Sequence, residues 1–407
     1  MIKLIKNEFI KIFKRSKTWI IFCLFIAFIM ITAFGTWKND KDIREWMSPE
    51  NQLAQLEEQL KYIQEDISRA EKENNSEWIN SSKDIEKSLL NDIERQKDII
   101  KNGINETAWK EELESNIENL EAQIKQYEEE GINEWNKYWY AQSKKNLEDY
   151  KYLLENNISP IESWEYNESS FFKNLSSFFG LGLLVAGISV FMSDIVSGEY
   201  TPATLKFLLV QPVKRGKILL SKYIVSIFTV IFLIIIPQII GIFLVNINSN
   251  IEVSDYPIRI EQKYEKIYDY DSQEMVLEEI PDTSKVITTN KFIVKSLLYQ
   301  ILFIVSACSI IFMFSTLFKN SMISMAISVI LTIFLSIGSQ AITTMKGISH
   351  LIFTTYSDTA NLLTSDLALS YQNTNLTTEN AIICMLITSI LAYIIAHINF
   401  TKKDILI

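Results

Sequence analysis

Residues 198–223 read GEYTPATLKFLLVQPVKRGKILLSKY, and this polar stretch separates two long apolar runs. Thr201 suits the N-cap position of a helix, and Pro202 suits its first turn. Pro212 disfavours helical backbone at Gln211, which precedes it. The stretch therefore predicts a helix of about nine residues, held between two apolar segments, that needs a surface to dock against.

Six windows of the chain contain no Asp, Glu, Lys or Arg. A bilayer crossing needs about 20 apolar residues, and all six windows reach that length. One ionised side chain at the bilayer centre costs about 2.5–3.5 kcal/mol, so such windows indicate membrane spans rather than buried helices of a soluble protein. The predicted spans are residues 18–37, 174–193, 223–250, 296–318, 320–345 and 380–401.

Basic residues gather on one face of this six-span topology. Residues 1–17 hold six Lys or Arg and one acid, Glu8, and the segment 194–222 is also basic. The opposite face is acidic, since residues 38–173 contain 18 basic and 32 acidic side chains. By the positive-inside rule, both termini are predicted to be cytoplasmic and residues 38–173 extracytoplasmic.

Residues 1–17 have apolar side chains at helical spacing with lysines between them. This pattern favours an amphipathic helix on the inner leaflet, attracted by anionic membrane lipids. A cluster of charges that only stops translocation is the alternative. The apolar positions are Ile2, Ile5, Phe9, Ile12 and Phe13.

The segment 38–173 carries heptad patterns typical of coiled coils. Asn-rich and Gly-rich breaks between the patterns suit turns. We expect three or four helices folded back on one another as antiparallel hairpins. The clearest seams are Leu53, Leu56, Leu60, Ile63, Ile67 and Ala70, and Trp109, Leu113, Ile117, Leu120, Ile124 and Tyr127.

The composition offers no catalytic site. Cys23, Cys308 and Cys384 lie inside predicted spans, and His350 and His397 stand alone, so no metal or nucleophile motif is formed. No glycine-rich phosphate-binding loop of the GxxxxGK type occurs. We therefore expect no cofactor, no enzymatic activity in this chain and no nucleic-acid partner.

The stretch at 198–223 resembles the cytoplasmic loop of type-2 ATP-binding cassette (ABC) exporter permeases. That loop has Glu, a Gly-Thr pair, a leucine-rich turn, Pro and Arg, followed by Leu and Lys at the next span. Ala203 stands where the family usually has glycine. The matching residues are Glu199, Thr204, Leu205, Leu208, Leu209, Pro212, Arg215, Leu219 and Lys222.

The resemblance implies a mechanism as well as a fold. The loop, within residues 194–222, would be a coupling helix seated on a separate cytoplasmic ABC ATPase that binds the ATP. The permease would form a homodimer or heterodimer, and residues 346–379 would form short re-entrant helices closing the outer end. The spans themselves offer few polar residues, which favours export of an amphipathic, peptide- or lipid-like substrate over ions; these residues are Ser306, Ser309, Ser328, Ser336 and Gln340.

The predicted fold class is an all-α integral membrane protein with six transmembrane helices and an extracytoplasmic antiparallel coiled-coil domain. Two other functions stay open. The ATPase could move the outer coiled coil as a mechanotransmitter, for example in resistance to or sensing of antimicrobial peptides. The chain could also be a membrane receptor without transport. High Ile, Lys and Asn usage is typical of a bacterium with an AT-rich genome.

Overall fold

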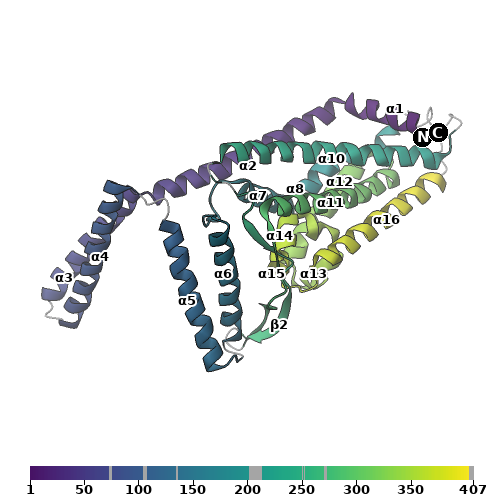
Figure 1. Ribbon diagram of the computed structural model, residues 1–407. Helices are drawn as coiled ribbons and strands as arrows, with labels where there is room; N and C mark the ends of the chain where they lie inside the picture. Colours follow the sequence, from purple (N-terminus) through teal and green to yellow (C-terminus); the bar gives the residue numbers. More distant parts are fainter. Residues whose placement is uncertain are drawn as a thin grey trace. The chain divides into compact units, whose positions relative to one another are not determined.

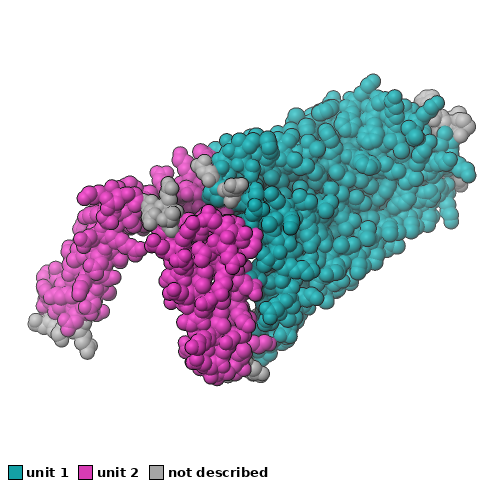
Figure 2. Space-filling view, in the orientation of Figure 1, with its two compact units in different colours: residues 1–34, 166–407 teal, residues 35–165 magenta. Residues whose placement is uncertain are grey.

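The structure is a computed structural model that describes residues 1–72, 76–103, 108–133, 136–200, 213–249, 251, 253–269 and 273–402. The chain forms two compact units, one of residues 1–34 and 166–407 and one of residues 35–165 (Figure 2). The second unit corresponds to the predicted outer segment 38–173, except that residues 166–173 belong to the first unit.

Five helices within the described residues are long and apolar enough to cross a membrane. They coincide with predicted spans 1, 3, 4, 5 and 6. The helix of span 1 continues well beyond residue 37, and the helix of span 3 starts before residue 223. The helices are α2 (Ser16–Trp46), α10 (Arg215–Asn248), α11 (Thr289–Leu317), α12 (Ser321–Ala341) and α16 (Thr378–Lys402).

The predicted second span, residues 174–193, is not one straight helix. It is divided between α7 (Glu168–Gly180) and α8 (Leu183–Met192), which are bent by 64° relative to each other. Gly182 lies between them with φ +87°, a left-handed conformation that glycine adopts without steric cost. Among the residues that the structure describes, the number of possible spans is six when this bent pair counts as one.

Small side chains bring the helices of the first unit close together. Helix α12 packs against α8 and α11, and it carries a buried row of hydroxyl residues at a spacing of four, Ser324, Ser328, Thr332 and Ser336. Small residues let helix backbones approach each other, which is the usual basis of helix association in membranes. Helix α11 packs against α16, α8 and α10, with Phe303, Ala307 and Phe312 fully buried.

Two antiparallel β ribbons between α10 and α11 were not predicted. Strand β1 (Pro257–Ile260) pairs with β4 (Lys285–Thr288), and β2 (Tyr264–Asp269) pairs with β3 (Glu274–Glu279). In β1 the side chains of Ile258 and Ile260 are buried and those between them are less so, which is the alternation of a half-buried strand. The fold is therefore mainly helical but not purely helical.

Short helices fill the segment between α12 and α16, where re-entrant helices are expected at residues 346–379. Tyr356 is fully buried there, and Asp358 caps α14 by accepting hydrogen bonds from the Asn361 backbone and from the Ser176 hydroxyl of α7. Re-entry into the membrane stays a prediction. The elements are α13 (Thr343–Ile348), η2 (Ser349–Leu351), η3 (Phe353–Ser357), α14 (Thr359–Thr364) and α15 (Asp366–Tyr371).

The second unit contains two helical hairpins (Figure 1). Helix α3 (Pro49–Lys72) packs against α4 (Ser76–Asn102), and α5 (Ala108–Glu130) packs against α6 (Lys137–Glu155). The most buried side chains of α3 and α5 are on the predicted seams, namely Ile67, Ala70, Leu113 and Ile124. The predicted helices are confirmed, while their supercoiling and their location outside the cell stay predictions.

Candidate functional site

Four charged side chains from three elements meet in one cluster of the first unit. They are Glu8 and Lys11 of α1 (Ile2–Phe13), Glu199 at the end of η1 (Ser197–Glu199), and Lys222 of α10. The Lys222 ammonium donates to both carboxylate oxygens of Glu8, at 2.9 and 3.0 Å, and to Glu199 Oε1 at 2.7 Å. The Lys11 ammonium also pairs with Glu199. We call these four residues the ion cluster.

The ion cluster is buried except at Lys11, whose side chain is 38% exposed. The side chains of Lys222 and Glu199 are 1% and 2% exposed, and that of Glu8 is 11% exposed. Removing a charge from water costs several kcal/mol, so buried charges need close partners of opposite sign. Two lysines and two glutamates satisfy this requirement, because their formal charges cancel and Lys222 donates to both carboxylates.

Helix α1 brings Glu8 and Lys11 to the cluster because one of its faces packs along α10. Ile12 and Glu8 are the buried residues of α1, four positions apart and therefore on the same face. The predicted amphipathic helix is present, but its packed face contains an acid as well as apolar side chains. Ile2 and Ile10, at the other side, are exposed.

A second group of ion pairs lies where α1 passes into α2. The Asp194 carboxylate is 3.0 Å from the Lys17 ammonium and 3.7 Å from the Arg15 guanidinium. Its Oδ1 atom accepts no hydrogen bond from the described residues. All three side chains are about one third exposed, with fractions of 28–35%. Water screens such pairs, so they contribute less than the ion cluster does.

The described backbone on either side of residues 200–214 is anchored to other helices. Before this segment, the Ser315 hydroxyl of α11 accepts hydrogen bonds from the backbone N–H of Val196 and Ser197, at 3.0 and 3.2 Å. After it, Gly216 of α10 lies so close to α16 that an added Cβ would be 2.7 Å from His397 Cε1. The backbone before the segment is therefore fixed to α11, and the helix that follows the segment is in close contact with α16.

Of the residues that match the coupling loop, Glu199, Arg215, Leu219 and Lys222 are within the described residues. Glu199 belongs to the ion cluster and is buried, so its carboxylate binds this chain's own lysines; Arg215 is the first residue of α10. Thr204, Leu205, Leu208, Leu209 and Pro212 lie outside the described residues.

Sequence reasoning did not assign a role to Glu8, Lys11 or Ser315. One local feature of the sequence could have indicated a role for Glu8, because it is the single acid among six basic residues in 1–17. For metal binding, the described part of the chain contains no group of three or more His, Cys, Asp or Glu side chains that could hold an ion. The cluster holds its charges in a fixed arrangement that connects α1, η1 and α10.

Comparison with protein families gives a match over residues 2–405 to the family described as ABC-2 family transporter protein. The chain belongs to the ABC-2 transporter family. Neither the curated proteins nor the solved structures include a match to it.

Membership of the ABC-2 family, together with the long apolar helices, makes this chain a multi-pass membrane protein and a permease subunit of an ABC transporter. Permeases of this family associate with a separate ABC ATPase, which supplies the catalytic activity. The match includes the two hairpins as well as the spans, because it covers nearly the whole chain. In this ABC-2 permease the ion cluster lies next to the segment that resembles the family's coupling loop.

Proposed function

We propose that this ABC-2 permease exports an amphipathic, peptide- or lipid-like substrate, driven by ATP hydrolysis on a cytoplasmic ATPase that docks on the coupling loop within residues 194–222, at the segment 200–214. Both termini are then cytoplasmic, residues 38–173 are extracytoplasmic, and a second permease subunit completes the pathway. The observation that carries the proposal is the ion cluster, which joins the residue before the docking segment to α1 and α10.

The cluster supports coupling because buried ion pairs resist separation. Glu199 immediately precedes the docking segment, and Lys222 lies in the second turn of the helix that follows it. Pulling them apart exposes uncompensated charge in a region with little water, which costs several kcal/mol. A displacement of the segment by the ATPase therefore moves α1 and α10 with it instead of being absorbed locally.

Spans lined mainly by apolar and hydroxyl side chains favour an amphipathic substrate over an ion. The buried polar residues of α11 and α12 within the described spans are Ser, Thr and Gln, with no acid or base among them. Such side chains form hydrogen bonds with polar groups of a substrate and leave the surrounding surface apolar.

A second candidate function is mechanotransmission through the hairpins. Residues 35–165 form a compact unit of their own, with helices of 19–27 residues in α3–α6. A rigid hairpin connected to a moving span can act on a partner outside the cell without conducting a substrate. Here the continuous helix α2, which extends from Ser16 to Trp46, supplies the connection.

The test is a comparison of Glu199→Gln with Asp194→Asn after co-purification with the ATPase and reconstitution into liposomes. We expect Glu199→Gln to keep the ATPase bound but to lower both the ATPase stimulation and the ATP-dependent transport of a fluorescent lipid analogue by about tenfold, since a loss of 1.4 kcal/mol in coupling is a factor of ten. Asp194→Asn removes a screened ion pair and should cause a smaller loss.

The outcomes separate the candidate functions. Equal, small losses in the two variants would show that the ion cluster does not couple the motor to the spans. Stimulated ATPase activity without movement of any amphipathic probe would favour mechanotransmission. A chain that co-purifies with no ATPase would contradict docking of the ATPase on this loop.

A further inference from the structure

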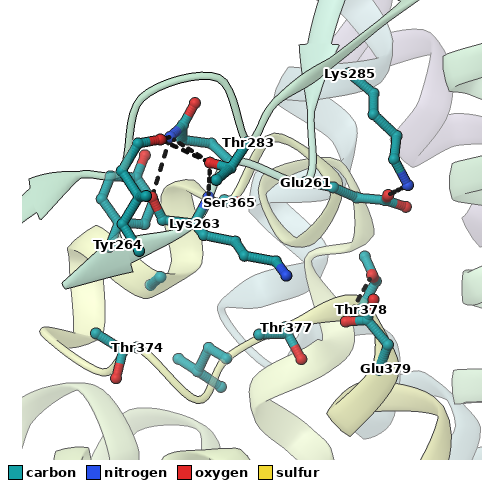
Figure 3. Close-up of a pocket in the computed structure, with 14 residues that line it drawn as sticks. Glu261, Lys263, Tyr264, Thr283, Lys285, Ser365, Thr374, Thr377, Thr378 and Glu379 are labelled. Atoms are coloured by element: carbon teal, nitrogen blue, oxygen red, sulfur yellow. Dashed lines mark hydrogen bonds and ion pairs between the residues drawn. The ribbon is translucent and has the colours of Figure 1, made fainter.

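A pocket of about 410 Å³ lies between the β ribbons and the segment that precedes α16 (Figure 3). One wall is formed by residues 261–264, which lead into β2 at Tyr264, together with Thr283 and Lys285. The opposite wall is formed by Thr374 and residues 376–379, and Ala368 of α15 also lines the pocket. This pocket is separate from the ion cluster and shares no residue with it.

The pocket lies at the ends of two membrane spans. Residues 374–379 lead directly into α16, which begins at Thr378, and β4 leads directly into α11, which begins at Thr289. Helices α11 and α16 pack against each other. The ends of packed spans are at the level of the lipid headgroups, where polar and apolar groups meet.

A hydrogen-bond network holds the first wall in place. The Gln262 side-chain amide donates to Thr283 Oγ1 at 3.0 Å and to the Ile280 carbonyl at 2.8 Å, and the Lys263 backbone N–H donates to Thr283 Oγ1 at 3.1 Å. The Glu261 backbone N–H donates to the Leu363 carbonyl at 2.8 Å, with φ +59° at Glu261. Left-handed backbone at a residue other than glycine is uncommon and often marks a functional site.

The Glu261 carboxylate is already paired with two lysines. Its carboxylate accepts hydrogen bonds from Lys285, at 2.8 Å, and from Lys295. Burial alone would raise the pKa of Glu261, but these two ammonium groups lower it below its ordinary value. Glu261 therefore stays ionised and contributes no unpaired negative charge to the pocket.

Lys263 and Glu379 are the charged side chains of the pocket that remain available. Within the described residues no acid pairs with the Lys263 ammonium, and its side chain extends toward Thr377 and Thr378 (Figure 3). The Glu379 carboxylate receives one long hydrogen bond of 3.4 Å from the Thr378 hydroxyl. The pocket thus offers a cation on the first wall and, on the opposite wall, hydroxyl groups and an anion.

The floor of the pocket is apolar. Tyr264, Ala368 and Leu376 line it and are buried, with Leu376 only 2% exposed. A ligand that fills the pocket therefore places an apolar part against these side chains and its polar part toward Lys263 and Glu379. The surrounding segment 246–291 is acidic, with 5 basic and 10 acidic residues, and it disfavours ligands with several negative charges.

We propose that this pocket binds the headgroup of a zwitterionic phospholipid. The phosphate contacts the Lys263 ammonium and the nearby threonine hydroxyls, the lipid ammonium contacts Glu379, and the glycerol ester region rests on Leu376 and Tyr264. Binding needs neither ATP nor a second subunit, so it holds or fails independently of the export proposal. Free phosphoethanolamine has the same phosphate and ammonium groups but no acyl chains. It therefore distinguishes a site for the headgroup alone from a site for the lipid.

The experiment measures binding of dihexanoyl-phosphatidylethanolamine to the full chain in a neutral maltoside detergent by calorimetric titration. Lys263→Gln should weaken binding by about tenfold, the size of one charge-assisted hydrogen bond. Lys266→Gln is the matched control, because Lys266 is an exposed lysine of β2 that does not line the pocket, and it should leave binding unchanged. Thermal unfolding of each variant checks that the fold is retained.

Glu379→Gln separates the two halves of the headgroup. It should weaken dihexanoyl-phosphatidylethanolamine by several-fold and leave dihexanoyl-phosphatidylglycerol, which has no ammonium, unchanged. Equal binding by the Lys263→Gln and Lys266→Gln variants would overturn the proposal, as would equal effects of Glu379→Gln on the two lipids. If free phosphoethanolamine binds as tightly as the lipid, the apolar floor takes no part and the ligand is not a lipid.

Discussion

Lysine and glutamate pair in both units of this permease, but under opposite conditions. In the first unit, Lys222 binds Glu8 and Glu199 with its side chain 1% exposed. In the hairpin of α3 and α4, Lys97 is 3.0 Å from Glu57, and both side chains are more than half exposed. The distances are alike, so the difference in energy comes from water.

The comparison shows which ion pairs resist being pulled apart. An exposed pair gains about 0–1 kcal/mol, since water solvates the separated charges almost as well. A buried pair adds little net stability when both members are present, but breaking it leaves an unsolvated charge. The ion cluster therefore resists displacement, while the hairpin pairs mainly keep a highly charged surface soluble.

The largest expected effect is that of Lys222→Met. The change leaves Glu8 and Glu199 buried without their shared cation, and we expect a loss of about 3–5 kcal/mol in the free energy of unfolding. Thermal unfolding in detergent measures it. Adding Glu8→Gln and Glu199→Gln to Lys222→Met removes the uncompensated charges and should restore most of the stability; no recovery in this triple variant would contradict the charge argument.

Leu113→Ala should have the next largest effect and should be confined to one hairpin. Leu113 of α5 is 2% exposed, and removing a buried leucine side chain costs about 2–5 kcal/mol. Hydrogen exchange should show lower protection in α5 and α6 and unchanged protection in α11. Glu114→Ala, an exposed position of the same helix, is the control. Loss of protection in α11 would mean that the units do not unfold independently.

Acid should weaken the ion pairs of Glu261 with Lys285 and Lys295, and this effect should be smaller. The pKa of this carboxyl is lowered, so its contribution to stability is complete above the unfolded value of about 4.3 and is lost as the pH falls through the folded value. Hydrogen exchange of β1 and β4, corrected for the intrinsic rate, should stay constant from about pH 7 to pH 5 and rise below pH 4. Glu261→Gln should abolish this dependence, and an unchanged dependence would assign it to other carboxylates.

Lys97→Gln should have the smallest effect, less than about 0.5 kcal/mol, because the pair with Glu57 is exposed. The same measurement of thermal unfolding applies. A loss as large as that of Lys222→Met would remove the distinction between buried and exposed pairs on which the comparison rests.

The local elements of the fold were predictable from the sequence because their causes are local. Charge-free windows predicted five of the observed long helices, and heptad spacing predicted those of the hairpins, since burial on one face repeats with the helical period. The break at Gly182 was not predicted. Its two glycines, Gly180 and Gly182, are visible in the sequence, but the close approach of Asp358 to Gly180 is not.

The β ribbons were not predicted, for a similar reason. Their strands have four to six residues, and an apolar alternation this short is weak evidence without the partner strand. Of the candidate site, Glu199 and Lys222 were singled out through the family resemblance. Their shared partner Glu8 is 214 positions from Lys222 and could not be connected to it by any local pattern.

The sequence by itself determined that this chain crosses a membrane several times and carries amphipathic helices between two of the spans. Hydrocarbon excludes charge, so the distribution of charged residues along the chain is enough for that conclusion. Only the tertiary structure decided which charges meet, where the second span bends and which walls enclose the pocket. These depend on contacts between residues far apart in the chain, and their energies exist only once the helices have packed.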